Sequence, residues 1–288
     1  NNSVAQNIEL TKNASLLFDS IEETKSNKYF ENKLFKYSET KDNYAFGKEE
    51  IFKFSWNGLS KESDITGQVR AFGKESVFFL DKDDIPDDSV AQTELDNKLS
   101  ELSEKIENII IPRIRTILGE ETAESLIFSN LTLDSIDNKI AFLFSGRLNG
   151  TGNIGFLNGK DLFKRDNLLN PLSNQQKILY LPIPGKSISD EEILSQVVYN
   201  LQKMFSLIEN TIWPYETGEN LEAKFESSWL DDGLSCLVSD LVGYGNYCFI
   251  AVYTYSTSLN TISLTGGIPS LGQRGGVYLL LRYLFERE

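Results

Sequence analysis

Three stretches between residues 49 and 81 show the alternation of apolar and polar side chains that is typical of β-strands. Apolar residues alternate with polar ones toward the end of Glu50–Trp56, and the alternation returns in Asp64–Phe72. A shorter apolar run follows at Ser76–Leu80. Because a period of two places every second side chain on one face of a sheet, these runs predict a small antiparallel sheet.

Two more short apolar runs, Lys139–Phe144 and Lys177–Pro182, are bounded by turn-forming polar residues. Between them, Gly146–Gly159 is rich in Gly and Asn, which predicts a loop or a wide hairpin. The N-terminal half is therefore expected to contain a mixed or antiparallel sheet.

One long helix is expected to interrupt these strands. Asp87–Leu118 has apolar residues mostly three or four positions apart, which is the period of a helix with one apolar face. Pro112 is expected to kink this helix, and Gly119 is expected to end it. The apolar face consists of Leu95, Leu99, Leu102, Ile106, Ile109 and Ile110.

The sequence of the C-terminal third predicts helices and few or no strands. Helices are expected from Asp190, as the N-cap, to about Asn210, at Ser228–Val242 and at Gly275–Arg287. Ile250–Tyr255 fits either a helix or a strand. Strands that mostly precede helices indicate an α+β fold.

The net charge of −14, from 28 basic and 42 acidic residues, excludes several classes of partner. Nucleic-acid binding needs a concentrated positive surface, and the same balance disfavours peripheral binding to anionic lipid. The sequence has no apolar run of the length that spans a membrane.

The sequence contains no His and two Cys, Cys236 and Cys248. The two Cys are interpreted either as a disulfide formed in an oxidising compartment or as buried free thiols. Without His, Ser–His–Asp and Cys–His catalysis are excluded. A structural zinc site of the usual kind, with four Cys or His ligands, is excluded as well.

Other catalytic arrangements have little support in the sequence. Ser206 and Lys203 are three residues apart on one predicted helix, but such pairs are common by chance. Carboxylates for glycoside chemistry could come from Asp231, Asp232 and Asp240. With 42 acidic residues in the chain, that pattern carries almost no information.

Three helical segments carry a set of motifs that belong together. Val197–Leu207 reads VVYNLQKMFSL, Ser227–Gly245 reads SSWLDDGLSCLVSDLVGYG, and Gly275–Arg287 reads GGVYLLLRYLFER. In this order they resemble three segments of the hyicolysin-like family of gluzincin metallopeptidases. The family segments are H-E-F-Q-H, then W-L-N-E-G-L-S with D-L-x-G-Y, and then Y-G-A-x-Y-L-F-x-R-Y-L.

The upstream half resembles the same family. The family's Gly-rich loop and D-L-F segment resemble Gly155–Phe163, and its S-N-E-x-x-I-L-Y segment resembles Ser173–Leu181. The resemblance therefore covers roughly residues 50–288. It implies a gluzincin metallopeptidase fold in three parts. These are a tether and accessory segment (1–48), a sheet-containing protease-like subdomain (49–186) and a helical protease-like subdomain (187–288).

In this family, three protein ligands hold a catalytic zinc ion, and a Glu beside the first ligand acts as the general base. Two ligands lie four residues apart, which places them on one helix face, one turn apart. Carried over by motif, the ligand positions fall on Tyr199, Lys203 and Asp232. The general base falls on Asn200.

These replacements remove the chemistry of the family site. Tyr199 would have to bind metal as a phenolate, Asn200 has no basicity, and Lys203 brings a positive charge to the place of the cation. Only Asp232 keeps a ligand-type side chain. We therefore expect no metal or other cofactor. Lys203 is expected either to pair with Asp232 or Asp231 in place of the metal, or to point to solvent.

The resemblance thus implies a pseudoprotease that acts by binding a protein or peptide partner. Trp229, Tyr199 and Tyr244 are expected to line the former cleft as an aromatic groove, together with Gln202, which still matches the family motif. The alternative is a hydrolase that uses the remaining carboxylates, Asp231 and Asp232, with a non-zinc divalent metal.

The family is exported, which gives a context for the polar segment at the start of the sequence. We expect an exported lipoprotein at the cell surface or on the periplasmic side of a membrane. It would associate with the membrane only through a lipidated Cys preceding Asn1. The other interpretation of Asn1 is an arbitrary boundary of the sequence.

Overall fold

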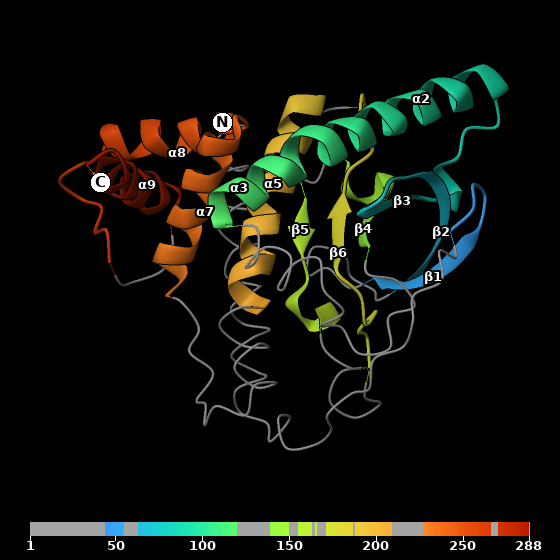
Figure 1. The fold of residues 1–288 in the computed structure, drawn as a ribbon, viewed down its shortest axis with the longest axis horizontal. Helices are drawn as coiled ribbons and strands as arrows, with labels where there is room; N and C mark the ends of the chain where they lie inside the picture. Colours follow the sequence, from blue (N-terminus) through green and yellow to red (C-terminus); the bar gives the residue numbers. More distant parts are fainter. Residues whose placement is uncertain are drawn as a thin grey trace.

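The computed structural model has the α+β architecture that the sequence predicts, with a curled sheet in the N-terminal half and helices in the C-terminal half (Figure 1). It describes residues 44–54, 63–119, 139–149, 155–162, 165, 171–186, 188–208, 227–265 and 270–287. Most of the predicted tether and accessory segment (1–48) lies outside these residues.

The described strands are β1 (Glu49–Phe54), β2 (Ser63–Phe72), β3 (Ser76–Asp81), β4 (Ile140–Phe144), β5 (Phe156–Leu157) and β6 (Ile178–Leu181). All but β5 lie close to their predicted positions, and β5 lies within Gly146–Gly159, which was predicted as a loop or a wide hairpin. The helices are α2 (Ser89–Lys105), α3 (Ile111–Leu118), α5 (Asp190–Leu207), α7 (Ser228–Val242), α8 (Asn246–Ser256) and α9 (Leu271–Phe285). Short helical turns are η2 (Lys82–Asp84), η3 (Ile106–Ile110), η4 (Gly146–Leu148) and η5 (Gly159–Leu162).

The sheet is larger than the small antiparallel one predicted from residues 49–81. Its strand order is β1-β2-β3-β4-β6-β5. The pairs β1–β2, β2–β3 and β5–β6 are antiparallel, whereas β3–β4 and β4–β6 are parallel. The helical connection between β3 and β4 explains the difference, because parallel neighbours require a long crossover. The sheet is therefore mixed.

The predicted long helix is present as α2, η3 and α3 in direct succession. Before Pro112 the chain forms a π-helical turn over Ile106–Ile110, with the Ile111 N–H bonded to the Ile106 carbonyl. A helix bends both at a Pro, which has no N–H to donate, and at a π turn, so the irregular part of this helix begins earlier than the predicted position. Gly119 ends the helix with a positive φ of 88°.

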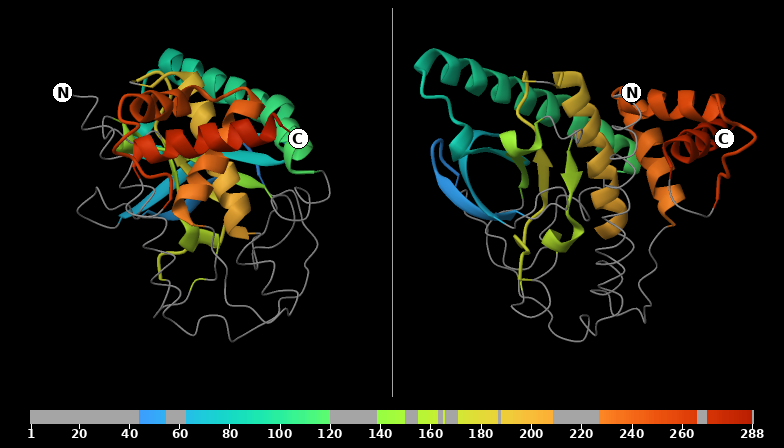
Figure 2. Two further views of the ribbon diagram at one scale, coloured as in Figure 1. Left: turned by 90° about the vertical axis from the view of Figure 1, so that its left-hand side faces the viewer. Right: turned by 180° about the vertical axis from the view of Figure 1, so that it is seen from behind.

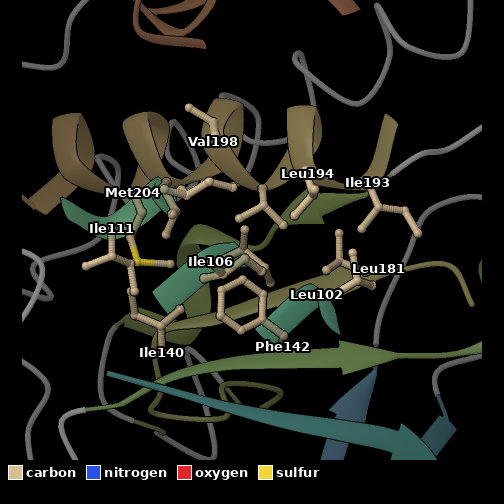
Figure 3. Packing of buried hydrophobic residues seen from close by; sticks show 14 of the residues in the cluster. Leu102, Ile106, Ile111, Ile140, Phe142, Leu181, Ile193, Leu194, Val198 and Met204 are labelled. Carbon is tan, nitrogen blue, oxygen red and sulfur yellow. The ribbon is translucent and has the colours of Figure 1, made fainter. Parts of the chain in front are cut away.

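The main core lies between one face of the sheet and helices α2, α3 and α5 (Figure 3). Side chains of these helices pack against those of β4 and β6. Within the sheet, the rings of Phe78 and Phe142 stack with their centroids 4.9 Å apart. Figure 3 labels Leu102, Ile106, Ile111, Ile140, Phe142, Leu181, Ile193, Leu194, Val198 and Met204 in this layer.

A polar cluster at the other face of the sheet joins β1 to β6. The buried carboxylate of Asp161 accepts hydrogen bonds from the Tyr180 hydroxyl (2.6 Å) and the Asn174 backbone N–H (2.7 Å). The Asn174 side chain donates to the Lys53 carbonyl (2.8 Å) and accepts from the Lys53 N–H (2.7 Å). Asn174 therefore occupies part of the outer edge of β1, much as another strand would.

The C-terminal helices form the end of the molecule that lies away from the sheet (Figure 2). Ser189, not Asp190, caps α5: its hydroxyl accepts from the Glu192 N–H, and the Glu192 side chain accepts from the Ser189 N–H. A Ser followed three residues later by Glu is a capping box, which explains why the cap lies one residue earlier than predicted. None of the helices in the described parts of the chain is long and apolar enough to cross a membrane.

Candidate functional site

The candidate site lies where the middle of α5 meets the first turn of α7. Tyr199 and Lys203 are four residues apart on α5, so both side chains point from one face of that helix. Asp231 ends the first turn of α7, and Asp232 follows it at the start of the second. The three positions that the resemblance assigns to metal ligands, Tyr199, Lys203 and Asp232, therefore converge in space.

Asp232 is the centre of this site. Its Oδ1 accepts a hydrogen bond from the Tyr199 hydroxyl (2.7 Å) and one from the Lys203 ammonium (2.6 Å). Its Oδ2 accepts from Nε (3.3 Å) and Nη2 (3.1 Å) of Arg274. Both oxygens of the carboxylate are thus taken by donors from the same chain.

The Lys203 ammonium joins the two neighbouring carboxylates near the start of α7. It lies 2.6 Å from Asp232 Oδ1 and 2.9 Å from Asp231 Oδ2, and the Lys203 side chain is only 4% exposed. The predicted pairing of Lys203 with Asp232 or Asp231 is confirmed, and it involves both. The alternative, in which Lys203 points to solvent, is wrong.

Arg274 and Tyr247 complete the site, and the sequence reasoning missed both. Arg274 lies on α9, 3% exposed, and its Nη1 donates to the Tyr247 hydroxyl of α8 (2.8 Å). The Arg274 guanidinium also lies 5.2 Å from the centre of the Tyr199 ring. The predicted helix begins at Gly275 and left Arg274 outside, whereas α9 begins at Leu271 and buries Arg274, whose charge then needs a partner. We call the six residues Tyr199, Lys203, Asp231, Asp232, Tyr247 and Arg274 the Asp232 cluster.

Small residues and a disulfide bring the four helices together around the cluster. A side chain at Gly233 would come within 2.3 Å of Val277, so α7 approaches α9 closely there. A side chain at Gly275 would lie 2.1 Å from the backbone oxygen of Ala251, which places α8 against α9. Cys236 and Cys248 form a disulfide between α7 and α8, which decides the alternative that the sequence left open.

The cluster balances two cations against two carboxylates. Burial alone would raise the pKa of Asp232, but Arg274 and Lys203 outweigh that effect and lower it well below its usual range. Burial would lower the pKa of Lys203, and Asp231 and Asp232 together raise it instead. Burial raises the pKa of Asp231, and Lys203 offsets this only in part. Lys203 and Asp232 are therefore charged at neutral pH.

The donor set does not fit a zinc ion. Zinc at a catalytic site needs three protein ligands with free lone pairs. Burial and the Asp232 charge keep the pKa of Tyr199 well above 10, so no phenolate is present. Lys203 has no lone pair when charged, and Asp232 already accepts four hydrogen bonds. Within the described residues, no group of three or more His, Cys, Asp or Glu side chains could hold a metal ion.

The other residues predicted for the site are less closely grouped. Asn200 is buried, and its side-chain amide donates to the Gln196 carbonyl one turn back on α5 (2.9 Å). Gln202 is buried as well and donates to Ser206 (3.2 Å). Neither residue has a hydrogen bond to Asp232, whose donors are Tyr199, Lys203 and Arg274.

The structure does not bring the three predicted groove residues together. Tyr199 is 5% exposed and belongs to the Asp232 cluster. Trp229 is half-buried at the start of α7, whereas Tyr244 follows the end of that helix and packs on the main core. At about 1.5 Å per residue, the two ends of α7 are roughly 20 Å apart. Trp229 and Tyr244 therefore do not face one another across a groove.

Comparison with known proteins adds no family to this geometry. No protein-family model matches the sequence, and a search of curated proteins finds no match.

Proposed function

We propose that this protein is a pseudoprotease, a metallopeptidase-like chain that does not catalyse hydrolysis and acts by binding a protein or peptide partner. One observation carries the proposal: the Lys203 ammonium lies between Asp231 and Asp232 at the position where the resemblance expects a cation. The three ligand positions converge, but an ammonium ion of the chain itself takes the place of the metal.

The chemistry of the cluster argues against catalysis. Hydrolysis by this family requires a polarising metal and a general base. The position of the base holds Asn200, which cannot take up a proton, and its amide is bonded within α5. The Asp232 cluster is instead suited to stabilise the contact between α5, α7, α8 and α9, because every one of its ionic groups has a partner of opposite charge.

The alternative is a hydrolase that uses Asp231 and Asp232 with calcium or manganese. These ions prefer several oxygen ligands with free lone pairs. Asp231 and Asp232 are bonded to Lys203 and Arg274, so a metal would have to displace both cations from buried positions. The geometry therefore favours the pseudoprotease.

The activity half of the proposal is tested with the untagged chain and an unfolded protein substrate. We expect no cleavage above the protein-free control with zinc, manganese, calcium or a chelator. Metal-dependent cleavage that Asp232→Asn abolishes would favour the hydrolase.

The binding half is tested by selecting peptides from a displayed library on the immobilised chain. Trp229→Ala serves as a probe of the neighbouring surface, because Trp229 is half-buried one turn from Asp232. We expect enriched peptides that bind the wild type and lose affinity for Trp229→Ala. Failure to enrich any peptide, together with no partner in a pull-down, would contradict the binding role.

A further inference from the structure

The surface of α8 and α9 exposes an unusual number of large apolar side chains. On α8, Tyr253 is 70% exposed, and Phe249 and Ile250 are more than half exposed. On α9, the exposed apolar residues lie in the last two turns. The set, which we call the α8/α9 face, is Phe249, Ile250, Tyr253, Leu279, Leu280, Tyr283, Leu284 and Phe285. Figure 2 (left) shows both helices lying across the same end of the molecule.

The size of this face exceeds what an isolated chain normally exposes. Each of its eight side chains is at least 40% exposed. If about half of the ~150–250 Å² of a large side chain is accessible in each, the total is on the order of 800 Å². The largest apolar patch on a typical monomer is about 300–600 Å². One partner in a standard protein interface contributes about 800 Å².

The sequence of α9 points to burial of this helix on all sides. Successive residues of a helix are about 100° apart, so Leu279, Leu280, Tyr283 and Leu284 form one exposed face about 140° wide, with the exposed Phe285 outside it, while Val277 and Tyr278 just before them are buried. Among the residues from Val277 to Phe285, the only charge is Arg282, which is bonded to Asp240 (2.8 Å). A helix that is apolar all round is normally buried all round.

The distribution of charge indicates which partner fits. The chain carries a net charge of −14, yet no charged residue occurs between Asp240 and Arg274, the stretch that contains α8. Two copies of so acidic a chain repel each other over most of their surfaces. At an uncharged apolar face they do not, and such a face is complementary to itself, as a twofold interface requires.

We propose that the α8/α9 face is the interface between two copies of this chain, related by a twofold axis. The interface buries Tyr253 of α8 and the last two turns of α9 against their counterparts. The inference is independent of the proposed function, because none of these residues belongs to the Asp232 cluster.

The test is the mass in solution of the untagged chain, measured by light scattering and sedimentation over a wide range of concentration. We expect a dimer, with twice the 32.6 kDa of one chain. The variants Tyr253→Asp and Tyr283→Asp place a charge on the face at exposed positions and should weaken dimerisation at least tenfold. The matched control is Ile51→Asp, which changes an equally exposed residue on β1 and should stay dimeric.

Circular dichroism and the melting temperature of the monomeric form establish that each variant is folded. A wild-type chain that is monomeric throughout would overturn the proposal, and so would Tyr253→Asp and Tyr283→Asp variants that remain dimeric. A different occupant of the α8/α9 face would be lipid. A monomeric wild type that floats with phosphatidylcholine vesicles would assign the face to a membrane surface and would equally overturn the proposal.

Discussion

The Lys203 ammonium lies 2.6 Å from Asp232 Oδ1, and it joins α5 to the start of α7. The same oxygen accepts the Tyr199 hydroxyl, and the other carboxylate oxygen accepts Arg274. The interaction links positions that the resemblance identifies with three metal ligands. The stability of the helical region therefore depends on the buried charges of Lys203, Asp232 and Arg274.

Replacing Lys203 by Met should destabilise the fold strongly. Asp232 keeps Arg274 and Tyr199, but Asp231 loses its cation while still buried. Removing one partner of a buried ion pair typically costs about 3–5 kcal/mol, so we expect a decrease of that size in the free energy of unfolding by urea.

Two variants control the Lys203→Met measurement. Lys53→Met removes a half-buried cation that pairs with the exposed Asp64 at 2.8 Å, and it should cost less than about 1 kcal/mol. The double variant Lys203→Met with Asp231→Leu removes the unpaired carboxylate too and should recover part of the loss. Equal losses in Lys203→Met and Lys53→Met would show that the Asp232 cluster contributes little to stability.

Replacing Tyr199 by Phe should lower stability with no change in fold. The variant keeps the ring under Arg274 and removes only the hydroxyl that donates to Asp232. A hydrogen bond to a charged group contributes about 1.5–3 kcal/mol, which is the loss expected in thermal or urea unfolding. Tyr278→Phe, which removes a half-buried hydroxyl bonded to Asp240 (3.0 Å), is the comparison and should cost less.

The stability of the sheet region should fall as the pH rises toward neutrality. Burial raises the pKa of Asp161 from 3.8 to about 7, more than the hydrogen bonds from Tyr180 and Asn174 lower it. The folded protein therefore holds this proton more tightly than the unfolded chain. The contribution of Asp161 to stability is complete below pH 3.8 and is lost as the pH passes 7, a change on the order of a few kcal/mol.

Unfolding of Asp161→Asn over the same pH range isolates this effect. The pKa values of Asp81 and Asp231 are also raised, mainly by burial, and these residues give both proteins a slope in the same direction. We expect the difference between wild type and Asp161→Asn to change between pH 4 and pH 7. A constant difference for Asp161→Asn would refute the assignment.

Loss of the disulfide should loosen the contact between α7 and α8. Cys236 and Cys248 are twelve residues apart, and closing a loop of about this length stabilises a protein by roughly 3 kcal/mol. The variant with both Cys replaced by Ala should have a free energy of unfolding that is lower by about that amount, measured by urea unfolding. Because both Cys are buried, reductant should act on the wild type only as it unfolds. Rapid reduction of the folded protein would contradict the buried placement.

The sequence predicted most elements because their periods are clear, and it missed what depends on tertiary contacts. The alternation in Asp64–Phe72 gave β2, and the apolar period of Asp87–Leu118 gave the long helix. The parallel pairing of β3 with β4 was missed, because no local pattern records which strands become neighbours. The ambiguous segment Ile250–Tyr255 belongs to a helix, α8, which the contact with α9 stabilises.

The candidate site was predicted in part. The resemblance, which assigns ligand positions to Tyr199 and Lys203 on one helix and to Asp232 on a second, led to the prediction of a salt bridge in place of a metal, and that ion pair is present. Arg274 and Tyr247 were missed because neither spacing nor motif connects them to Asp232, although the fold does. The prediction of an aromatic groove failed because Trp229 and Tyr244 lie at opposite ends of α7.

The metal content of the untagged protein, measured by mass spectrometry after dialysis against zinc, tests the central claim most directly. The comparison is a variant that restores the family residues, Tyr199→His, Asn200→Glu, Lys203→His and Asp232→Glu. We predict that the wild type retains no stoichiometric zinc and that the restored variant, shown to be folded by circular dichroism, retains one ion per chain. One tightly held zinc ion in the wild type would contradict the account, because Lys203 could not then occupy the position of the cation.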